Sequence, residues 1–268
     1  MLHIATTHHI SPRWIEIQTR HIRAHISVPY RTWASIQLID PSYGAHFDRI
    51  IEQNGPLAGK LNHLAVEILE EASDDDLLMF LDGDAFPIAD PMPVVMEGLQ
   101  AAPLVAVRRA ENAGDPQPHP CFCVSSVATW RELAGDWSDG YPWSDERGRR
   151  VTDVGANLLR RLELSGTPWV QLLRSNPRRL DPLAFAIYGG VIYHHGADAG
   201  ELSRAQRERA PRPLGGAGLP LLGAAAARFD RARLRLWSRR AQRTCLLRSE
   251  LLYAKIQQGG SDWLADVS

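Results

Sequence analysis

The chain has 268 residues, of which 44% are hydrophobic and 23% are charged, and a formal net charge of −1. This composition is typical of a soluble globular protein with a sizeable core. No segment approaches the roughly 18 apolar residues of a membrane span, and the first residues lack the basic-then-apolar pattern of a secretory signal. Three cysteines make neither a disulfide framework nor a zinc site, which fits a reducing cytoplasm. Cys121 and Cys123 alternate in a strand-like stretch and are expected to face the same side of the core.

Strands and helices are predicted to alternate along the first 200 residues. The expected strands span residues 2–7, 31–39, 77–81, 104–108, 122–126 and 169–173, and the expected helices span residues 14–24, 59–72, 92–100 and 156–163. Their order, β-α-β-α-β-α-β, predicts a three-layer α/β domain with a mostly parallel sheet over residues 1–200. Residues 201–268 are predicted to form a linker, with Pro and Gly clusters at 204–223, and a basic helical C-terminal extension.

The segment Leu77–Leu81 is an unbroken apolar run that ends abruptly in Asp82-Gly83-Asp84. Such a run predicts a strand buried on both faces, and open α/β sheets bind ligands at the carboxyl ends of their strands. Two carboxylates at this position offer oxygen ligands to Mg²⁺ or Mn²⁺, and a metal would relieve the repulsion between their charges. Gly83 would allow another backbone or a phosphate to approach closely. The alternative is an ordinary turn, because Asp and Gly are common turn residues.

Two surface loops are predicted at residues 111–120 and 136–150, because both segments are polar and rich in turn-forming residues. The second loop carries three aromatic residues, Trp137, Tyr141 and Trp143. These side chains either stack on a sugar or pin the loop to the body of the protein.

The charges are distributed unevenly along the chain. Residues 201–255 hold 13 Lys and Arg against 4 Asp and Glu, whereas residues 1–200 hold 17 against 25. In the basic part, apolar residues recur among arginines at helical spacing, at Phe229, Leu236, Leu247 and Leu251. We expect a helix that packs this apolar stripe on the body; the alternatives are attraction to anionic lipid, to a phosphate-bearing acceptor or to a second subunit. Nucleic-acid binding is not expected, since no recognised nucleic-acid motif accompanies the charge.

Several segments together resemble those of GT-A-type nucleotide-sugar glycosyltransferases. In chain order they are the strand end Thr6-Thr7, the helix GKLNHLAVEIL, the Asp-x-Asp motif in FLDGDAFPI, the acidic helix start TDVGANLL and the late histidine segment VIYHHG. The resemblance covers roughly residues 1–200 and implies a three-layer GT-A-like, Rossmann-like catalytic domain. It also implies a metal-dependent transferase, hexosyltransferase-like and of undetermined stereochemistry, that moves a sugar from a nucleoside-diphosphate donor to an acceptor hydroxyl.

The resemblance implies that Asp84 is a direct ligand of Mn²⁺ or Mg²⁺ that bridges the donor diphosphate. Asp82 would bind the metal or the ribose hydroxyls. His194 or His195 would supply a nitrogen ligand, which suits Mn²⁺ better than Mg²⁺. Adjacent strand residues face opposite ways, so one of the two histidines is expected to coordinate, and His194 is preferred. The alternative is that both histidines are polar residues at a strand end.

The remaining site residues follow from the same resemblance. Thr6 and Thr7 would hydrogen-bond the base or the ribose. Lys60 would contact phosphate and Asn62 the base or ribose, unless the two residues are simply part of a solvated helix terminus. Asp153 would be the catalytic carboxylate, which in an inverting transferase takes the proton from the acceptor hydroxyl. The alternative is that Thr152 or Asp153 caps the helix that follows.

Two other classes of protein compete with this interpretation. A haloacid-dehalogenase-type phosphohydrolase also places Asp-x-Asp after a buried strand, but typically near the amino terminus and with Thr or Val where this chain has Phe86. A non-catalytic, metal-dependent nucleotide- or glycan-binding protein would keep the binding groups without turnover.

The expected partners are a nucleoside-diphosphate sugar and a glycan or small-molecule acceptor, with no nucleic acid. The expected location is the cytoplasm, and attachment to the inner face of the membrane or self-association through the basic tail is left open.

Overall fold

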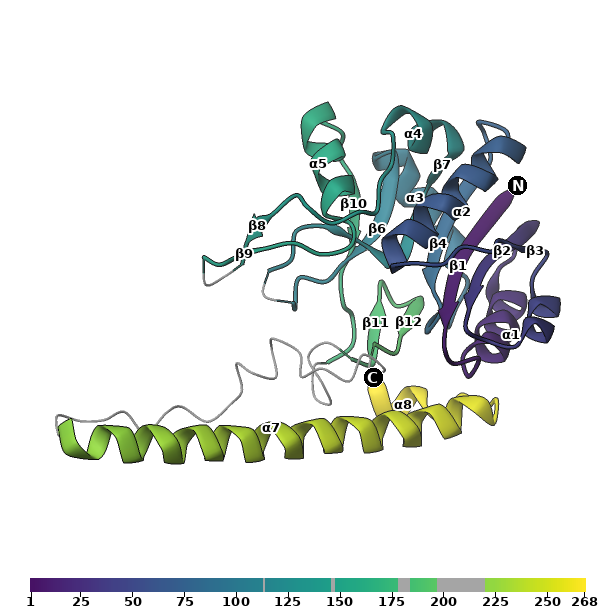
Figure 1. Ribbon diagram of the computed structural model, residues 1–268. Helices are drawn as coiled ribbons and strands as arrows, with labels where there is room; N and C mark the ends of the chain where they lie inside the picture. The colour runs from purple at the N-terminus through teal and green to yellow at the C-terminus, as the bar shows by residue number, and fades with distance from the viewer. Residues whose placement is uncertain (113, 146–147, 178–183, 197–219) are drawn as a thin grey trace. The chain divides into compact units, whose positions relative to one another are not determined.

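Figure 1 shows the computed structural model of the chain, which describes residues 1–112, 114–145, 148–177, 184–196 and 220–268; for residues 220–235 and 238 it describes the backbone alone. The chain divides into two compact units. The first comprises Met1–Asn176 with Ala186–His194, and the second comprises Pro177–Phe185 with His195–Ser268. The domain boundary expected at residue 200 stays a prediction.

A seven-stranded sheet forms the centre of the first unit, in the order β10-β6-β7-β4-β1-β2-β3. Its strands are β1 (Leu2–His9), β2 (Tyr30–Gln37), β3 (Arg49–Ile50), β4 (Leu77–Asp82), β6 (Leu104–Arg108), β7 (Pro118–Ser126) and β10 (Val170–Leu172). In this sheet β7 runs antiparallel to its neighbours β4 and β6, and the other pairs are parallel. The predicted α/β class with a mostly parallel sheet is confirmed.

Helices pack on both faces of this sheet (Figure 1). One buried apolar cluster includes residues of α1 (Ile15–His25) and α3 (Met92–Ala101), and the other includes residues of α2 (Leu57–Glu71), α4 (Val127–Glu132) and α5 (Ala156–Ser165). The strand β4 contributes to both clusters, with Met79 and Leu81 in the first and Leu78 and Phe80 in the second. Successive strand side chains face opposite ways, so a strand covered on both sides is apolar throughout. The predicted three-layer arrangement is therefore confirmed.

A smaller sheet of three strands, β11 (Ala186–Tyr188), β12 (Ile192–His194) and β5 (Ala85–Pro87), is antiparallel throughout. It joins the segment after the Asp-x-Asp motif to the late histidine segment, because Ala85 stands opposite His194. The sequence predicts a strand at Val191–His195 but not its partners.

The connections of the first unit also include a 3-10 turn, η1 (Pro41–His46), and a two-stranded ribbon of β8 (Trp143–Ser144) and β9 (Arg150–Val151).

The segment between β6 and β7 differs from its prediction in two respects. The loop expected at 111–120 is shorter, because β7 already begins at Pro118. Cys121 and Cys123 lie in different apolar clusters, so the expectation that they face the same side is wrong. The pairing register of β7 with β6 shifts over this stretch, and such an irregularity breaks the simple alternation of side chains.

The aromatic residues of the loop at 136–150 are mostly held by the protein itself. Trp137 is fully buried, with its ring centroid 5.0 Å from that of Phe80 and 5.7 Å from that of Trp130. Tyr141 donates its hydroxyl hydrogen to Glu163 at 2.6 Å. Trp137 therefore holds the loop against the body of the protein and is not open to stack on a sugar.

The second unit contains the long helix α7 (Pro220–Gln257) and the short helix α8 (Leu264–Val267). The predicted basic helical extension is thus present. Residues 204–219 of the predicted linker lie outside the described residues, and its last four residues belong to α7. None of the helices in the described residues combines the length and the hydropathy that a membrane span needs.

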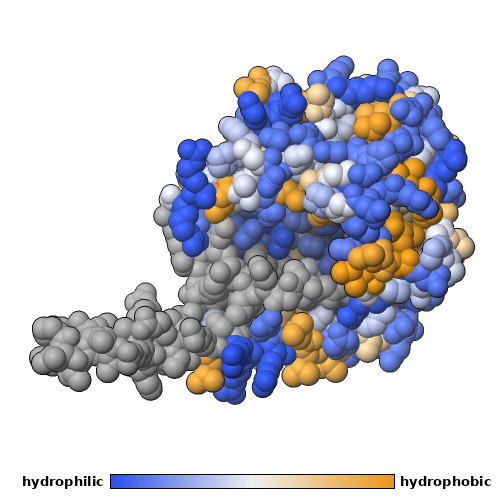
Figure 2. Space-filling model, in the orientation of Figure 1, coloured by the Kyte–Doolittle hydropathy of each residue, from blue (hydrophilic) through white to orange (hydrophobic). Residues whose placement is uncertain are grey.

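The apolar stripe predicted for this helix is not buried where it is described. Leu236, Leu247 and Leu251 are 67%, 66% and 66% exposed, whereas Leu252 and Ile256 are the buried apolar residues on α7. Figure 2 shows hydrophobic and strongly hydrophilic residues side by side along this helix. The expectation that this stripe packs on the body stays a prediction, and the side chain of Phe229 lies outside the described part of the helix.

Candidate functional site

The Asp-x-Asp motif lies where the carboxyl ends of β1 and β4 meet. Thr7 of β1 pairs with Asp82 of β4, and the chain then turns through Gly83 and Asp84 into β5. A Cβ atom on Gly83 would lie 2.3 Å from the Thr7 carbonyl oxygen and 2.8 Å from His8 Nδ1. Glycine is therefore required here by the close approach of the β1 backbone, one of the two reasons that the sequence left open.

The side chains of Asp82, Asp84 and His194 meet at this turn. Each offers one potential ligand atom, and the three atoms lie within 4.8 Å of one another; among the described residues, this is the group of His, Cys, Asp or Glu found close enough to share a metal ion. His194 Nε2 is 3.3 Å from Asp84 Oδ1 and 4.0 Å from Asp82 Oδ2. The pairing of β12 with β5 explains this meeting, because His194 stands opposite Ala85. Two carboxylates and an imidazole form a donor set that suits Mn²⁺.

The neighbouring His195 is engaged within the second unit. Its Nε2 is 2.7 Å from Ser249 Oγ, and its ring packs edge-on against Phe185. The geometry is thus in line with the preference for His194, whose role as a metal ligand stays a prediction.

Burial dominates the electrostatics around these side chains. It raises the pKa of the Asp82 carboxyl to about 6, while the His194 ring opposes this rise and the Asp84 charge adds to it. The ring of His119 lies 5.7 Å from that of His194, and burial together with the Arg109 cation holds the pKa of His119 well below its usual value. Burial therefore keeps the His119 imidazole neutral at neutral pH, while the Arg109 cation opposes the rise in the pKa of Asp82.

Lys60 is a buried cation that has no carboxylate partner in the described part of the chain. It is 3% exposed, and its Nζ donates to Gln37 Oε1 at 3.2 Å. Burial lowers the pKa of Lys60. Burial also lowers the pKa of His8 to about 4, and the charges of Asp84 and Lys60 act on this imidazole in opposite directions. A buried cation accompanied by an amide oxygen suits an anionic ligand such as phosphate.

Thr6 and Thr7 lie at the end of β1, beside the motif. Thr6 is fully buried, and its hydroxyl donates to Gln18 Oε1 at 3.0 Å. Thr7 is 8% exposed and pairs with Asp82. Their contacts with a base or ribose stay predictions.

Asn62 holds the loop that follows α4. Its Nδ2 donates to Asp136 Oδ1 at 2.8 Å, and its Oδ1 accepts from the Trp137 N–H at 2.8 Å. A second donation from Nδ2 reaches Ser138 Oγ at 3.4 Å. Asn62 is thus engaged by its own loop, and its contact with a nucleotide stays a prediction.

Asp153 is an exposed carboxylate just before α5, and its Oδ1 accepts from the Val154 N–H at 2.8 Å. Burial is the main cause that raises the pKa of Asp82 to about 6 and of Asp115 to about 7, and the Asp153 charge adds to both rises. Asp153 is therefore within electrostatic range of the candidate metal site. The helix α5 has Gly155 as its N-cap and no side-chain capping hydrogen bond, so the alternative role of Asp153 as the helix cap is wrong. The catalytic role stays a prediction.

Asp115 is a buried carboxylate that sequence patterns did not reveal. It is 1% exposed; its Oδ1 accepts from the Gln117 N–H at 3.0 Å, and its Oδ2 has no hydrogen-bond partner in the described residues. Gln117 Nε2 donates to the Val154 carbonyl oxygen at 2.9 Å, which ties the two loops together. The surrounding Pro, Gly and Asn residues indicate a surface loop, so the sequence carries no signal of this burial.

Gln18 is a second polar residue that was not selected, although the sequence carries a signal for it. With Ile15 and Ile22 it occupies positions i, i+3 and i+7 of α1, which is the buried stripe of an amphipathic helix. A polar side chain on that stripe needs hydrogen-bond partners. Gln18 is fully buried and finds its partners at the Asp-x-Asp turn.

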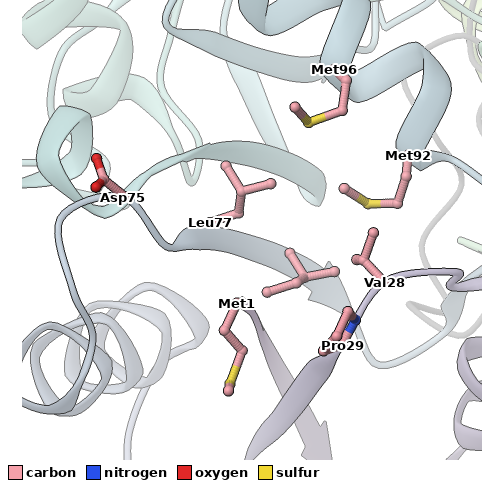
Figure 3. A pocket seen from close by; sticks show the side chains of 8 residues that line it. Met1, Val28, Pro29, Asp75, Leu77, Met92 and Met96 are labelled. Carbon is pink, nitrogen blue, oxygen red and sulfur yellow. The ribbon is translucent and has the colours of Figure 1, made fainter.

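A separate groove of about 520 Å³ lies at the other end of the sheet, where β1 and β4 begin (Figure 3). It is lined by Met1, Leu2, Val28, Pro29, Asp75, Leu77, Met92 and Met96. This lining is apolar apart from Asp75 and includes none of the predicted site residues. The groove is therefore distinct from the candidate metal site.

Comparisons with known proteins concern the architecture. A scan against protein-family models gives no match, and a search of curated proteins gives none either. Among solved structures, the chain is similar to the mannosyltransferase PcManGT from Pyrobaculum calidifontis in complex with GDP-Man and Mn²⁺, at 14% identity over 98% of this chain and 77% of that chain, with a TM-score of 0.43. It is similar to the apo-form glycosyltransferase GlyE of Streptococcus pneumoniae, at 12% identity over 88% of this chain and 62% of that chain, with a TM-score of 0.44. S. aureus TarS is similar at 10% identity over 51% of this chain and 30% of its own length, with a TM-score of 0.38, so the chain spans less than a third of TarS. PcManGT and GlyE are glycosyltransferases, the class that the sequence motifs resemble.

Proposed function

We propose that the chain is a metal-dependent glycosyltransferase that moves a sugar from a nucleoside-diphosphate donor to an acceptor hydroxyl. The sugar that we propose is a hexose. The observation that carries the proposal is the cluster of Asp82, Asp84 and His194, whose ligand atoms lie within 4.8 Å of one another. The cluster stands at the carboxyl end of the sheet, where α/β proteins bind ligands. Lys60 lies within electrostatic range of the same turn and lacks a carboxylate partner in the described residues. A metal site beside a buried cation meets the needs of a diphosphate leaving group.

Asp82, Asp84 and His194 would hold Mn²⁺ or Mg²⁺, and the imidazole favours Mn²⁺. The donor set fits such an ion, because two carboxylates and an imidazole whose ligand atoms lie within 4.8 Å of one another can share one divalent cation. The ion supplies electrostatic stabilisation of the negative charge on the departing nucleoside diphosphate. Lys60 adds a positive charge that its hydrogen bond to Gln37 already holds in place, so little reorganisation is needed.

Asp153 is the proposed catalytic carboxylate. It is exposed, unlike Asp115, and is therefore open to an acceptor hydroxyl, whose proton it would take during attack on the anomeric carbon. Thr6, Thr7 and Asn62 are the proposed contacts of the base and ribose. We place the reaction in the cytoplasm, with α7 as a peripheral attachment to an anionic membrane surface or to a second copy, since its exposed leucines stand among arginines.

Replacing Asp84 tests the proposal. Asp84→Asn keeps the size of the side chain but removes its charge, so Mn²⁺-dependent sugar transfer is expected to fall on the order of a hundredfold or more. Asp75→Asn is the matched control, because Asp75 lines the groove at the other end of the sheet and is exposed. The measurement is nucleoside-diphosphate release from nucleotide sugars, with circular dichroism to show that both variants fold. Near wild-type turnover by Asp84→Asn would contradict the proposal.

The same assay separates the competing classes of protein. Uridine, guanosine, cytidine and thymidine diphosphate sugars are supplied in turn with an acceptor panel, and generic phosphate monoesters are supplied in parallel. Metal-dependent release from one nucleotide sugar supports the transferase and identifies the donor base. Phosphate release from monoesters would support the phosphohydrolase instead, and donor binding without turnover would support a non-catalytic binding protein.

A further inference from the structure

Gln18 is a fully buried side chain of α1 whose hydrogen bonds reach both ends of the Asp-x-Asp turn. Its Nε2 donates to the carbonyl oxygen of Asp82 at 2.7 Å and to that of Ala85 at 2.8 Å. These two carbonyls bracket Gly83 and Asp84. Both N–H donors of the amide are therefore used by the segment that carries two of the proposed metal ligands.

The other half of the amide faces β1. Gln18 Oε1 accepts from the Thr6 hydroxyl at 3.0 Å and lies 3.1 Å from His8 Nε2. The two carbonyls identify Nε2 as the donor of the amide, so Oε1 is the acceptor and His8 carries its proton on Nε2. The Nδ1 lone pair of His8 then lies beside Gly83, where a Cβ atom would be 2.8 Å from it.

We propose that Gln18 is the positioning residue that holds the Asp82–Ala85 turn in the shape required for metal binding. The inference rests on the proposed metal-dependent function. The amide uses two donors and two acceptor positions in a site closed to water, and such a saturated buried network has one low-energy arrangement. Because its donors bind backbone carbonyls on either side of Asp84, Gln18 sets the directions in which the Asp82 and Asp84 carboxylates point. Groups that orient metal ligands in this way typically change metal affinity when they are removed.

Two substitutions remove the positioning hydrogen bonds in different ways. Gln18→Met fills a similar volume with no hydrogen-bonding group. Gln18→Glu keeps the shape and the acceptors but replaces the donor with an oxygen that faces two carbonyl oxygens. Gln100→Met and Gln100→Glu are matched controls, because Gln100 lies on the exposed side of α3.

Hydrogen exchange followed by mass spectrometry reports on the turn in the metal-free protein. In Gln18→Met, the peptide covering residues 80–88 is expected to exchange at least about tenfold faster than in the wild type. The strand β6, which pairs with β10 and β7, is expected to exchange as slowly as before, since the loss is local. Unchanged exchange of residues 80–88 would overturn the proposal. Equal acceleration in β6 would overturn it as well, because Gln18 would then serve the stability of the whole unit.

Mn²⁺ affinity gives the second readout, through the electron paramagnetic resonance signal of the free ion in the presence of UDP, GDP, CDP or dTDP. Both Gln18 variants are expected to bind Mn²⁺ about tenfold to a hundredfold more weakly than the wild type and the Gln100 controls. Affinity within twofold of the wild type, with the variants folded, counts against the proposal. A wild-type protein that binds no Mn²⁺ would refute the proposed function, whereas hydrogen exchange decides separately whether Gln18 holds the turn.

Discussion

The carboxyl of Asp115 is a group whose titration should affect the stability of the fold. Burial raises the pKa of Asp115 to about 7, the hydrogen bond from the Gln117 N–H opposes this rise, and the Asp153 charge adds to it. A folded-state pKa above the unfolded value of about 3.9 means that the native protein holds the proton more tightly than the unfolded chain. The stability contributed by this group is therefore complete below about pH 4 and is lost as the pH rises to about 7.

Asp115→Asn tests this assignment. The amide has no proton to lose, so the free energy of unfolding of the variant, minus that of the wild type, is expected to increase from pH 5 to pH 8. The increase should be on the order of 1–3 kcal/mol, because each unit of pKa shift corresponds to about 1.4 kcal/mol. Urea unfolding at the two pH values measures it, and Asp139→Asn, on an exposed turn, serves as the control. A difference that stays constant with pH would show that Asp115 is ionised throughout.

Single residues could be named from the sequence where a local pattern marks them. Asp82 and Asp84 end an apolar run, and that position in an α/β protein lies at the ligand-binding edge of the sheet. Gln18 and Asp115 depend on contacts between segments far apart in the chain, so no local pattern predicts their partners. For Asn62, both its helix and the loop at residues 136–150 were predicted, but not the hydrogen bonds that join them.

Among the elements, the turn between β4 and β5 depends on one residue. Gly83 passes so close to β1 that a Cβ atom would lie 2.3 Å from the Thr7 carbonyl oxygen. That oxygen belongs to the backbone of a central strand, which pairs on both sides and cannot retreat. The turn therefore tolerates no side chain, for a reason of space alone.

Gly83→Ala is expected to lower the free energy of unfolding by about 1–3 kcal/mol, the usual effect of overpacking a filled site. It should also weaken Mn²⁺ binding, because the added methyl group displaces the turn that carries Asp82 and Asp84. Gly59→Ala is the matched control: Gly59 lies in α2, and a Cβ atom there would come no closer than 3.8 Å to Pro56. That substitution should be neutral or stabilising, since alanine favours a helix over glycine. Chemical unfolding of both variants compares them, and equal stability of the two would contradict the crowding argument.

The long elements were predictable because each carries its own periodicity. The apolar stripe of α2 and the continuous apolar run of β4 both report burial directly. The three-residue strands β5, β11 and β12 have too few positions for a period and form through their mutual pairing. The sequence therefore showed the small sheet as one isolated strand, without the pairing that places His194 beside the carboxylates.

At the scale of the whole chain, the charge distribution bears on how the proposed site would hold an anionic ligand. Residues 1–200 hold 17 Lys and Arg against 25 Asp and Glu, so the body that carries the candidate site is acidic. An acidic body repels a nucleoside diphosphate unless local positive charge outweighs the overall field. Lys60 and Arg109 are such charges, and a divalent ion held by Asp82 and Asp84 would be a further one.

Thermal unfolding in the presence of UDP, GDP, CDP and dTDP, each with Mn²⁺ and with EDTA, tests this balance on the full chain. One nucleotide with Mn²⁺, at about a hundred times its dissociation constant, should stabilise the protein by about 2.7 kcal/mol, which raises the melting temperature on the order of 5 °C. With EDTA the shift should vanish, because the carboxylates then repel the diphosphate. Lys60→Met should reduce the shift while Mn²⁺ alone still binds, since this lysine is proposed to meet the phosphates and not the ion. A shift that persists in EDTA would mean that the nucleotide binds without the metal, and the turn at Asp82 would then have no part in holding it.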